Sequence, residues 1–264
     1  MPFPDIDPVL FQIGPVAVRW YSLAYIFGVV LGIYVARRIA RSFAEFHLSP
    51  ADVDDFGFWS VLGIILGGRL GYVALYNPGF YLENPVEIVK TWNGGMSFHG
   101  GLVGVAVVAV LFCWRRRIRL LDLSDVVVCV APIGLFLGRL ANFVNGELWG
   151  RSTSLPWGVV FPQAGGALPR HPSQLYEATL EGVVLLLILG ALVRAKWARS
   201  MSGFLTGTFL ALYGVFRILV EITREPDAPL LGPLTRGQAY SLPMVVIGAW
   251  LLCRALVVTR RQPM

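Results

Sequence analysis

The sequence predicts an all-α integral membrane protein, with seven transmembrane helices in a single membrane domain over residues 1–264. Hydrophobic residues make up 56% of the chain and charged residues only 14%. Soluble proteins carry roughly 25% charged residues, so the composition excludes a soluble fold. A bilayer-spanning helix needs about 20 mostly apolar residues. Seven segments meet this requirement: 17–36, 54–75, 97–114, 123–144, 176–194, 203–223 and 239–258.

The basic residues give these spans an orientation. Thirteen of the 22 Lys and Arg lie in the short loops after the first, third and fifth spans or at the end of the chain, where Arg254, Arg260 and Arg261 stand. Because basic loops stay in the cytoplasm, we expect the N-terminus outside and the C-terminus in the cytoplasm. The net charge of +6 therefore indicates membrane topology, and no nucleic acid is expected as a partner.

The loops predicted to face outward are the longer ones. Residues 76–96 open with the turn signal Tyr76-Asn77-Pro78-Gly79 and continue with an amphipathic piece over 85–92. Residues 145–175 contain four prolines and a glycine pair, so we expect a small periplasmic cap there. The chemistry is accordingly expected on the outer face.

Three arginines, Arg69, Arg139 and Arg217, lie inside predicted spans. An ionisable residue at such a depth is costly, so each is a functional-site hypothesis. Arg69 stands among glycines, which let a neighbouring helix or a lipid headgroup approach closely. For Arg69, structural pairing and substrate binding both remain open.

The fourth span ends in the stretch 138–150. Arg139 and Asn142 are three residues apart and share a helix face, and Glu147 follows just beyond them. One interpretation is an internal Arg–Glu pair that locks the helices together. We favour a bound anion, because an arginine, an amide and a carboxylate at one helix end suit the binding and orientation of such a group.

The sixth span carries a polar stripe on an otherwise apolar helix. Tyr213, Arg217, Glu221 and Arg224 follow at intervals of four, four and three residues, so they share one face. In lipid this face must point into the protein. Tyr21, near the start of the first span, is also well placed for a pocket.

Two glycine pairs, Gly94-Gly95 and Gly100-Gly101, bracket His99. We expect irregular or re-entrant backbone there, which is tolerated at membrane depth only when it is buried in protein or lines a wet cavity. Neutral imidazole accepts a proton near physiological pH, so His99 is a candidate base. His171 and Glu177, which precede and begin the fifth span, are interpreted as structural or catalytic.

These residue types favour phosphate chemistry. The planar fork of donors on arginine suits phosphate, and arginines at headgroup depth indicate a phospholipid. Such a clamp stabilises charge on a phosphate leaving group, and a histidine or carboxylate can take a proton from a nucleophile. The chain has no Gly-x-Ser-x-Gly, His-Glu-x-x-His or Walker motif, so serine, zinc and ATP chemistry are disfavoured.

In the segments 67–72, 96–101, 138–150, 170–177 and 216–221, the sequence resembles the bacterial prolipoprotein diacylglyceryl transferases. The resemblance covers nearly the whole chain in order, and the fourth-span segment matches the family signature. The loop between Trp157 and Arg170 is short compared with some members.

The resemblance implies transfer of a diacylglyceryl group from phosphatidylglycerol to the lipobox cysteine thiol of a prolipoprotein. A thioether forms and glycerol phosphate leaves. It also implies a multi-pass protein of the bacterial inner membrane, with its site toward the outer face and no cofactor. The residues implied as most important are His99, Arg139 and Arg217. Supporting positions are Tyr21, Asn142, Glu147, Gly150, Tyr213 and Glu221.

Together these lines predict that Arg139 and Arg217 hold the phosphate while His99 takes the thiol proton. A thiol has a pKa near 8.5 and must ionise to attack. The arginines themselves can lower that pKa, so His99, His171, Glu147 or no dedicated base remain open.

Two other functions would also account for arginines inside the spans. A lipid or anion transporter would show repeated halves with broken helices, and the sequence has no such symmetry. A non-catalytic scaffold would pair the arginines with glutamates, for which the candidates are Glu147, Glu177, Glu181 and Glu221.

Overall fold

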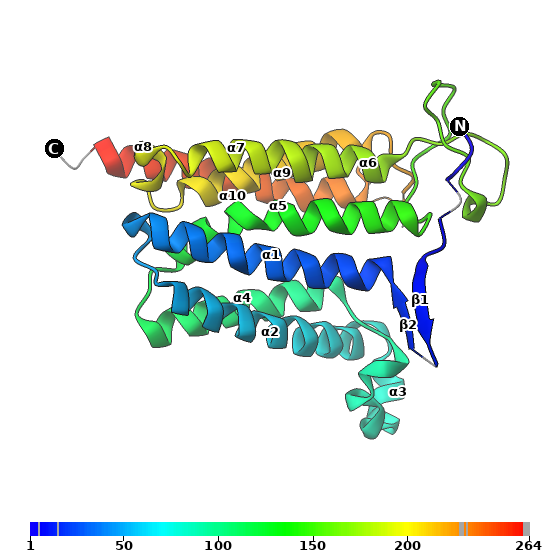
Figure 1. Cartoon of the computed structure of the whole chain (residues 1–264), viewed down its shortest axis with the longest axis horizontal. Helices are drawn as coiled ribbons and strands as arrows, with labels where there is room; N and C mark the ends of the chain where they lie inside the picture. Colours follow the sequence, from blue (N-terminus) through cyan, green and yellow to red (C-terminus); the bar gives the residue numbers. More distant parts are fainter. Residues whose placement is uncertain (5, 15, 227–229, 231, 261–264) are drawn as a thin grey trace. The chain divides into compact units, whose positions relative to one another are not determined.

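The computed structural model describes residues 1–4, 6–14, 16–226, 230 and 232–260 (Figure 1). Its strands are β1 (Val9–Ile13) and β2 (Val16–Arg19). Its helices are α1 (Trp20–Ser42), η1 (Ala44–Phe46), α2 (Pro50–Tyr76), α3 (Pro78–Glu83), η2 (Pro85–Val89), η3 (Thr91–Asn93), α4 (Phe98–Arg116), α5 (Leu120–Val144), η4 (Pro162–Ala164), α6 (Ser173–Glu177), η5 (Ala178–Val184), α7 (Leu185–Leu192), α8 (Lys196–Arg199), α9 (Phe204–Glu221) and α10 (Arg236–Arg260).

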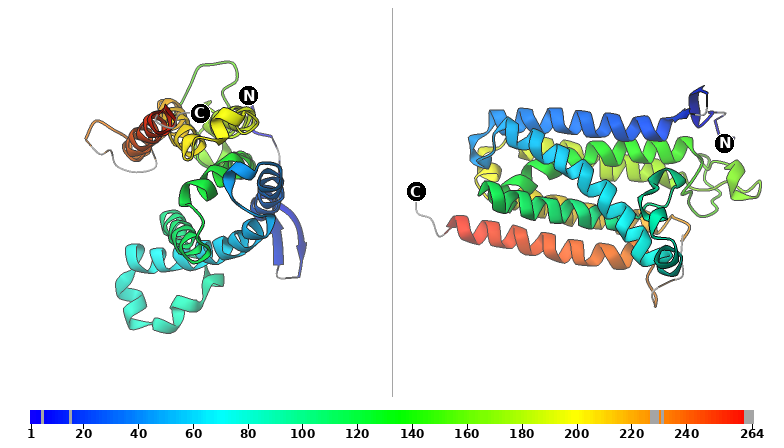
Figure 2. Two further views of the ribbon diagram at one scale, coloured as in Figure 1. Left: turned by 90° about the vertical axis from the view of Figure 1, so that its left-hand side faces the viewer. Right: turned by 90° about the horizontal axis from the view of Figure 1, so that it is seen from below.

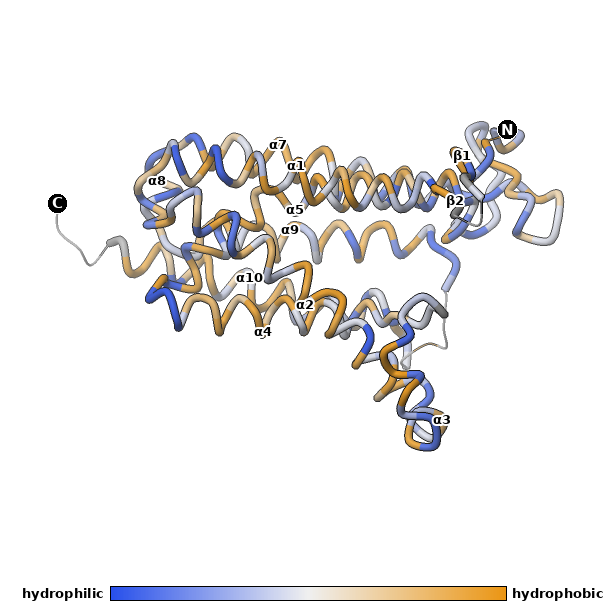
Figure 3. Tube along the Cα trace, turned by 60° about the horizontal axis from the view of Figure 1, so that its bottom comes forward, coloured by the Kyte–Doolittle hydropathy of each residue, from blue (hydrophilic) through white to orange (hydrophobic). Residues whose placement is uncertain are grey.

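The seven predicted spans are confirmed. Within the described residues, seven helices are long and apolar enough to cross a membrane: Trp20–Ser42, Pro50–Tyr76, Phe98–Arg116, Leu120–Val144, Ser173–Leu192, Phe204–Glu221 and Arg236–Val258. Figure 3 shows that hydrophobic residues dominate the middles of these helices, while hydrophilic residues gather near their ends and in the connections. Arg261, used in the prediction of topology, lies outside the described residues.

The start of the first span was predicted too early. Residues 16–19 form β2, which pairs antiparallel with β1, with Gln12 opposite Ala17. This segment is short and carries β-branched valines, which favour strands. In the sequence, its apolar residues lead almost directly into those of the helix, so the apolar pattern does not separate the two elements. The helix itself begins at Trp20 and continues to Ser42.

The chain forms two compact units, each described by itself. The first comprises residues 1–36 and 124–264, and the second comprises residues 37–123. The first unit therefore holds most of α1, nearly all of α5, and everything from α6 to α10. The second unit holds α2 and α4 with the short helices between them.

In the first unit, α9 and α10 lie side by side (Figure 2). They approach closely at glycines: a Cβ added at Gly214 would lie 2.7 Å from Val245 Cγ2, and one at Gly207 would lie 3.0 Å from the carbonyl oxygen of Gly248. Small residues of this kind allow close helix packing in membranes, where apolar burial gives no net drive.

A buried carboxylate joins α5 to the start of α9. Asp125, 1% exposed, accepts hydrogen bonds from Gly203 N at 2.7 Å, Thr206 N at 2.8 Å and Thr206 Oγ1 at 2.6 Å. The first N–H groups of a helix lack partners within the helix. Asp125 satisfies two of these N–H groups and places a negative charge at the positive end of the α9 dipole.

The fifth span is a continuous helix of three parts, α6, η5 and α7. Its middle part, Ala178–Val184, is π-helical. A π-helical turn is rare and often marks a functional site. Gly182 within it packs on Phe136 of α5, where an added Cβ would lie 2.7 Å from Phe136 Cβ. The irregular turn thus lies in tight contact with the fourth span.

The predicted cap, residues 145–175, contains no spanning element. Isolated antiparallel bridges fold it back on itself at Ser152–Arg170 and Val159–Arg170, and a further bridge joins Gly150 to Arg224 after α9. The loop is therefore tied by backbone hydrogen bonds to the end of the sixth span.

In the second unit, α2 and α4 pack through facing glycines. An added Cβ at Gly71 would lie 2.7 Å from Gly100 Cα, and one at Gly67 would lie 2.9 Å from Gly104 Cα. This corrects the prediction of irregular backbone around His99. Only Gly94 and Gly95 adopt positive φ, of 82° and 81°, whereas His99 and the glycines after it lie in α4.

Gly100→Ala should destabilise the protein, because the new methyl group would lie 2.9 Å from Gly71 Cα and overpacking costs about 1–3 kcal/mol. Gly101→Ala is the matched control, since its nearest neighbour would be 3.5 Å away. The control should be neutral or slightly stabilising, because Ala is the better helix former. Thermal unfolding in detergent measures both, and equal midpoints would contradict the packing argument.

Candidate functional site

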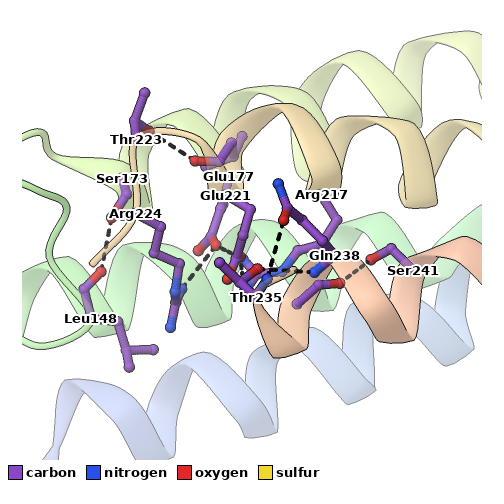
Figure 4. Close-up of polar contacts among 12 residues, drawn as sticks. Leu148, Ser173, Glu177, Arg217, Glu221, Thr223, Arg224, Thr235, Gln238 and Ser241 are labelled. Atoms are coloured by element: carbon purple, nitrogen blue, oxygen red, sulfur yellow. Dashed lines mark hydrogen bonds and ion pairs between the residues drawn. The ribbon is translucent and has the colours of Figure 1, made fainter. Parts of the chain in front are cut away.

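Three arginines of the first unit converge on one glutamate, Glu177, whose side chain is fully buried. Arg139 Nε lies 3.1 Å from Glu177 Oε2. Arg217 Nη1 and Arg224 Nη1 both donate to Glu177 Oε1, the latter at 2.9 Å. Figure 4 shows Glu177 with Arg217, Arg224 and Glu221 around it. Three helix ends thus meet at a single carboxylate.

Two further buried glutamates complete this group, which we call the ionic cluster. Glu181 Oε2 lies 3.5 Å from Arg139 Nη2, and Glu221 Oε2 lies 2.8 Å from Arg217 Nη2. The cluster, defined as Arg139, Glu177, Glu181, Arg217, Glu221 and Arg224, therefore contains three guanidinium groups and three carboxylates. Burying charges is tolerated only when they are paired and hydrogen-bonded, and these six residues pair one another.

The interpretation of an internal Arg–Glu pair is therefore confirmed for Arg139, with Glu177 and Glu181 as its partners. The glutamate nearest in sequence, Glu147, has other neighbours. Arg139 and Arg217 both contact these buried carboxylates, so the positive charge of the two arginines is balanced within the protein. Glu177 and Glu181 lie near the start of the fifth span, and Glu221 lies on the stripe 213–224 of the sixth span.

The arginines of the cluster differ in accessibility. The Arg139 side chain is 18% exposed and that of Arg217 is 13% exposed, whereas Arg224 is 4% exposed. A guanidinium carries five N–H donors, and the described contacts of Arg139 and Arg217 leave some of them available. These two side chains can therefore hold the glutamates and still reach a ligand.

Tyr213 adjoins the cluster. It lies one turn before Arg217 on α9, within electrostatic range of Arg139 and Glu181, and its ring stacks on Phe209 with a centroid distance of 5.7 Å. The predicted stripe on α9 therefore faces inward. Glu221, at the far end of this stripe, packs against Gly237 of α10, where a Cβ would lie 2.5 Å from Glu221 Cδ.

A second polar group follows the cluster along α5. Asn142 Nδ2 donates to Glu147 Oε1 at 2.7 Å, and Asn145 Nδ2 donates to the same oxygen at 3.4 Å. Tyr21 lies beside Asn142 and Glu147, and its hydroxyl is 3.2 Å from that of Tyr25. The amide donors fix the Glu147 carboxylate.

Close packing explains why residue 150 is a glycine. Its N–H donates to the carbonyl oxygen of His171 at 2.8 Å. A Cβ at this position would lie 2.5 Å from the carbonyl oxygen of Thr223 and 2.6 Å from His171 Cβ. Only glycine fits where the cap crosses the backbone that follows α9.

The other two predicted site residues, Arg69 and His99, belong to the second unit. Arg69 is 4% exposed and donates to five backbone carbonyls of the segment after α2. This geometry supports the structural interpretation of Arg69. His99 lies exposed in the first turn of α4, with its ring 5.6 Å from that of Phe98.

The sequence offered Glu177 as one of four possible partners of the arginines and placed Arg224 on the stripe, but it did not predict that three arginines share Glu177. The sequence could have indicated Glu181 and Arg224 as members of a buried ionic group. Each is an ionisable residue near the end of an apolar span, and Arg224 lies on the predicted stripe. The convergence on Glu177 depends on how three helices pack, which spacing along one helix does not encode.

The chain was compared with known families and proteins. Residues 8–254 match the family model described as prolipoprotein diacylglyceryl transferase. The chain belongs to this family. It is therefore a transferase of a bacterial family, and the resemblance noted in the sequence is confirmed. Within its described residues, the seven long apolar helices indicate a multi-pass membrane protein.

Its relatives are similar over nearly their whole length. A protein of Rhizobium meliloti (strain 1021) is 53% identical over 97% of this chain and 94% of its own length. A protein of Rhodospirillum rubrum is 55% identical over 94% and 92%, and one of Azospirillum brasilense is 50% identical over 99% and 97%. Each is named phosphatidylglycerol–prolipoprotein diacylglyceryl transferase. The transporter alternative is not favoured by these relatives.

Glu177→Gln should destabilise this transferase strongly, because it leaves the three arginines of the cluster with one carboxylate fewer. Breaking a buried pair costs about 3–5 kcal/mol. Glu181→Gln is the matched control: Glu181 is equally buried, but among the described residues its ion pair is with Arg139 alone, at 3.5 Å, so a smaller loss is expected. Thermal unfolding in detergent compares them. A Glu177 variant as stable as the control would contradict the shared-partner role.

Proposed function

We propose that the chain transfers the diacylglyceryl group of phosphatidylglycerol to the lipobox cysteine of a prolipoprotein, as the names of its relatives state for them. The observation that carries the proposal for the site is the pair of partly exposed arginines, Arg139 and Arg217, held in place by buried glutamates inside membrane-spanning helices. This arrangement suits a phosphate at the end of a lipid.

The glutamates give this site a specific advantage. A bare pair of arginines inside lipid would be costly, and their mutual repulsion would spread them apart. Glu177 lies between them and holds both side chains at fixed distances without occupying all of their donors. Donors that are fixed before the substrate arrives need no reorganisation when charge develops in the transition state, so no free energy is lost in moving them.

In the proposed reaction, the cysteine thiolate attacks the glyceryl carbon that carries the phosphoester. The new C–S bond forms as the C–O bond to phosphate breaks, and the bonding pair leaves with the oxygen as glycerol phosphate. The leaving phosphate gains negative charge, which Arg139 and Arg217 stabilise. The proton lost by the thiol ends on a base or on the departing phosphate.

Tyr21, Asn142 and Glu147 are proposed to orient the lipid headgroup. Asn142 lies one helical turn beyond Arg139 and donates to Glu147, whose carboxylate is fixed by two amides. A fixed carboxylate is a suitable acceptor for the hydroxyl groups of a glycerol headgroup. Tyr213, one turn before Arg217 on α9, is proposed to add a phenolic donor at the phosphate side.

His99 is proposed as the group that accepts the thiol proton, with His171 and Glu147 as the other candidates. His171 is engaged in the cap: its Nδ1 lies 3.2 Å from the Tyr176 hydroxyl. Glu147 already accepts from two amides. The chain is further proposed to lie in the inner membrane, with its N-terminus and the site on the outer face, as its basic loops indicate.

Arg139→Lys tests the phosphate contact. Lysine keeps the positive charge beside Glu177 but presents a point charge in place of a planar fork, so folding should be largely retained. We expect about a 10²- to 10³-fold loss of transfer from phosphatidylglycerol to a lipobox peptide, measured by mass spectrometry of the peptide.

Arg224→Lys is the matched control, since Arg224 shares Glu177 but is nearly inaccessible. It should lower stability more than it lowers the rate of transfer. A near-normal rate for the Arg139 variant would contradict the proposed contact, and wild-type protein that adds no diacylglyceryl mass to the peptide would overturn the proposed function itself.

His99→Gln tests the proton acceptor. At neutral pH the variant should transfer about 10²-fold more slowly, at the lower end of the range usual for general base catalysis. The deficit should shrink as the pH approaches about 8.5, because the thiol then ionises without help. Transfer rates measured across pH 6–9 check this. A variant with the wild-type rate at every pH would remove His99 from the mechanism and leave the arginines in it.

A further inference from the structure

The segment between α2 and α4, residues 77–97 of the second unit, presents an apolar outer surface. Its helices α3, η2 and η3 connect two spanning helices directly. Val86, Val89 and Trp92 are 67%, 68% and 76% exposed. Val86 and Val89 are three residues apart within η2, which is the repeat of a 3₁₀-helix, so they lie on one face. Trp92 lies in the next short helix, η3. Leu82, 84% exposed, precedes them on α3.

The opposite side of this segment is fixed to α2 by Arg69. All five N–H donors of its guanidinium contact backbone carbonyls: Nε donates to Ile88 at 2.8 Å, Nη1 to Gly94 at 2.5 Å and Gly95 at 3.0 Å, and Nη2 to Glu87 at 2.6 Å and Lys90 at 3.2 Å. The ring of Tyr81 also lies 5.2 Å from the guanidinium carbon. Arg69 therefore has no donor left for a substrate.

The depth of this contact follows from the position of Arg69. It lies seven residues before the end of α2, which corresponds to about 10 Å along the helix. The α2 residues 56–76 are almost all apolar and long enough to cross the hydrocarbon layer. Ser97 N also donates to the carbonyl oxygen of Gly68 at 2.8 Å. The chain thus turns back along α2 to this level before α4 begins.

We propose that residues 78–95 form a re-entrant arm that lies in the lipid interface, with Val86, Val89 and Trp92 against the lipid. Non-helical backbone at membrane depth requires internal partners for its carbonyl groups, and Arg69 provides five hydrogen bonds at once. Trp is enriched at membrane interfaces. The membrane is the occupant of this face because both ends of the arm are fixed to spanning helices. This inference is independent of the proposed reaction.

Spin labelling of the full-length protein in phosphatidylglycerol-containing vesicles tests the arm. In a background with Cys113, Cys129 and Cys253 replaced by alanine, a nitroxide is placed at position 86, 89 or 92. Glu83, an exposed polar residue of the same segment, is the control position. We expect collisions with oxygen to exceed those with a water-soluble nickel complex at the three apolar positions, and the reverse at position 83.

Higher access to nickel at positions 86, 89 and 92 would place the arm in water and overturn the proposal. Low access to both reagents would also overturn it, since the arm would then be covered by protein. Quenching by brominated lipids gives a second readout without labels: Trp92→Phe should reduce the quenchable fluorescence of the wild-type chain. An unchanged quenchable fraction would contradict lipid contact at Trp92.

Arg69→Gln tests the anchor, because glutamine offers two N–H donors in place of five. Labels at positions 86–92 should gain mobility and access to nickel, whereas a label at Val110, exposed on α4, should be unchanged. That control position shows whether the helices remain folded. An arm that stays immobile and lipid-exposed in this variant would remove Arg69 as its anchor.

Discussion

The structure depends on how arginines are neutralised inside a bilayer. Glu177 is the central example, since it is fully buried and contacts arginines from the fourth span, the sixth span and the residues after it. A buried charge without a partner would be far more costly than any other contact here. The positions of α5, α6 and α9 relative to one another at this end are therefore set by electrostatics, and close packing at small residues follows.

Two kinds of buried arginine result. Arg69 donates all five of its guanidinium N–H groups to backbone carbonyls and acts as a structural anchor. Arg139 and Arg217 contact glutamate side chains and keep part of their surface exposed. The same residue type thus fixes a loop in the second unit and is proposed to bind a substrate in the first.

Much of this was predictable from the sequence. Length and apolar composition identified all seven spans, and the interval of four residues placed Tyr213, Arg217 and Glu221 on one inward face. The β-hairpin before Trp20 was missed because its apolar residues continue into the helix. The helical conformation at Gly100 was missed because its cause is contact with α2, a partner distant in sequence. The ionic cluster was missed as a cluster for the same reason: pairing between spans is a tertiary property.

The central claim is that Arg139 and Arg217, held by Glu177, bind the phosphate of the lipid substrate. Solid-state NMR measures it most directly, through the dipolar coupling between the ³¹P nucleus of phosphatidylglycerol and ¹⁵N-labelled guanidinium nitrogens in the membrane-embedded protein. The account predicts nitrogen–phosphorus distances of about 4 Å, as in hydrogen-bonded Arg–phosphate pairs, with the coupling reduced in Arg139→Lys and in Arg217→Lys. Coupling that is unchanged in both variants would assign the phosphate to other arginines and contradict the account.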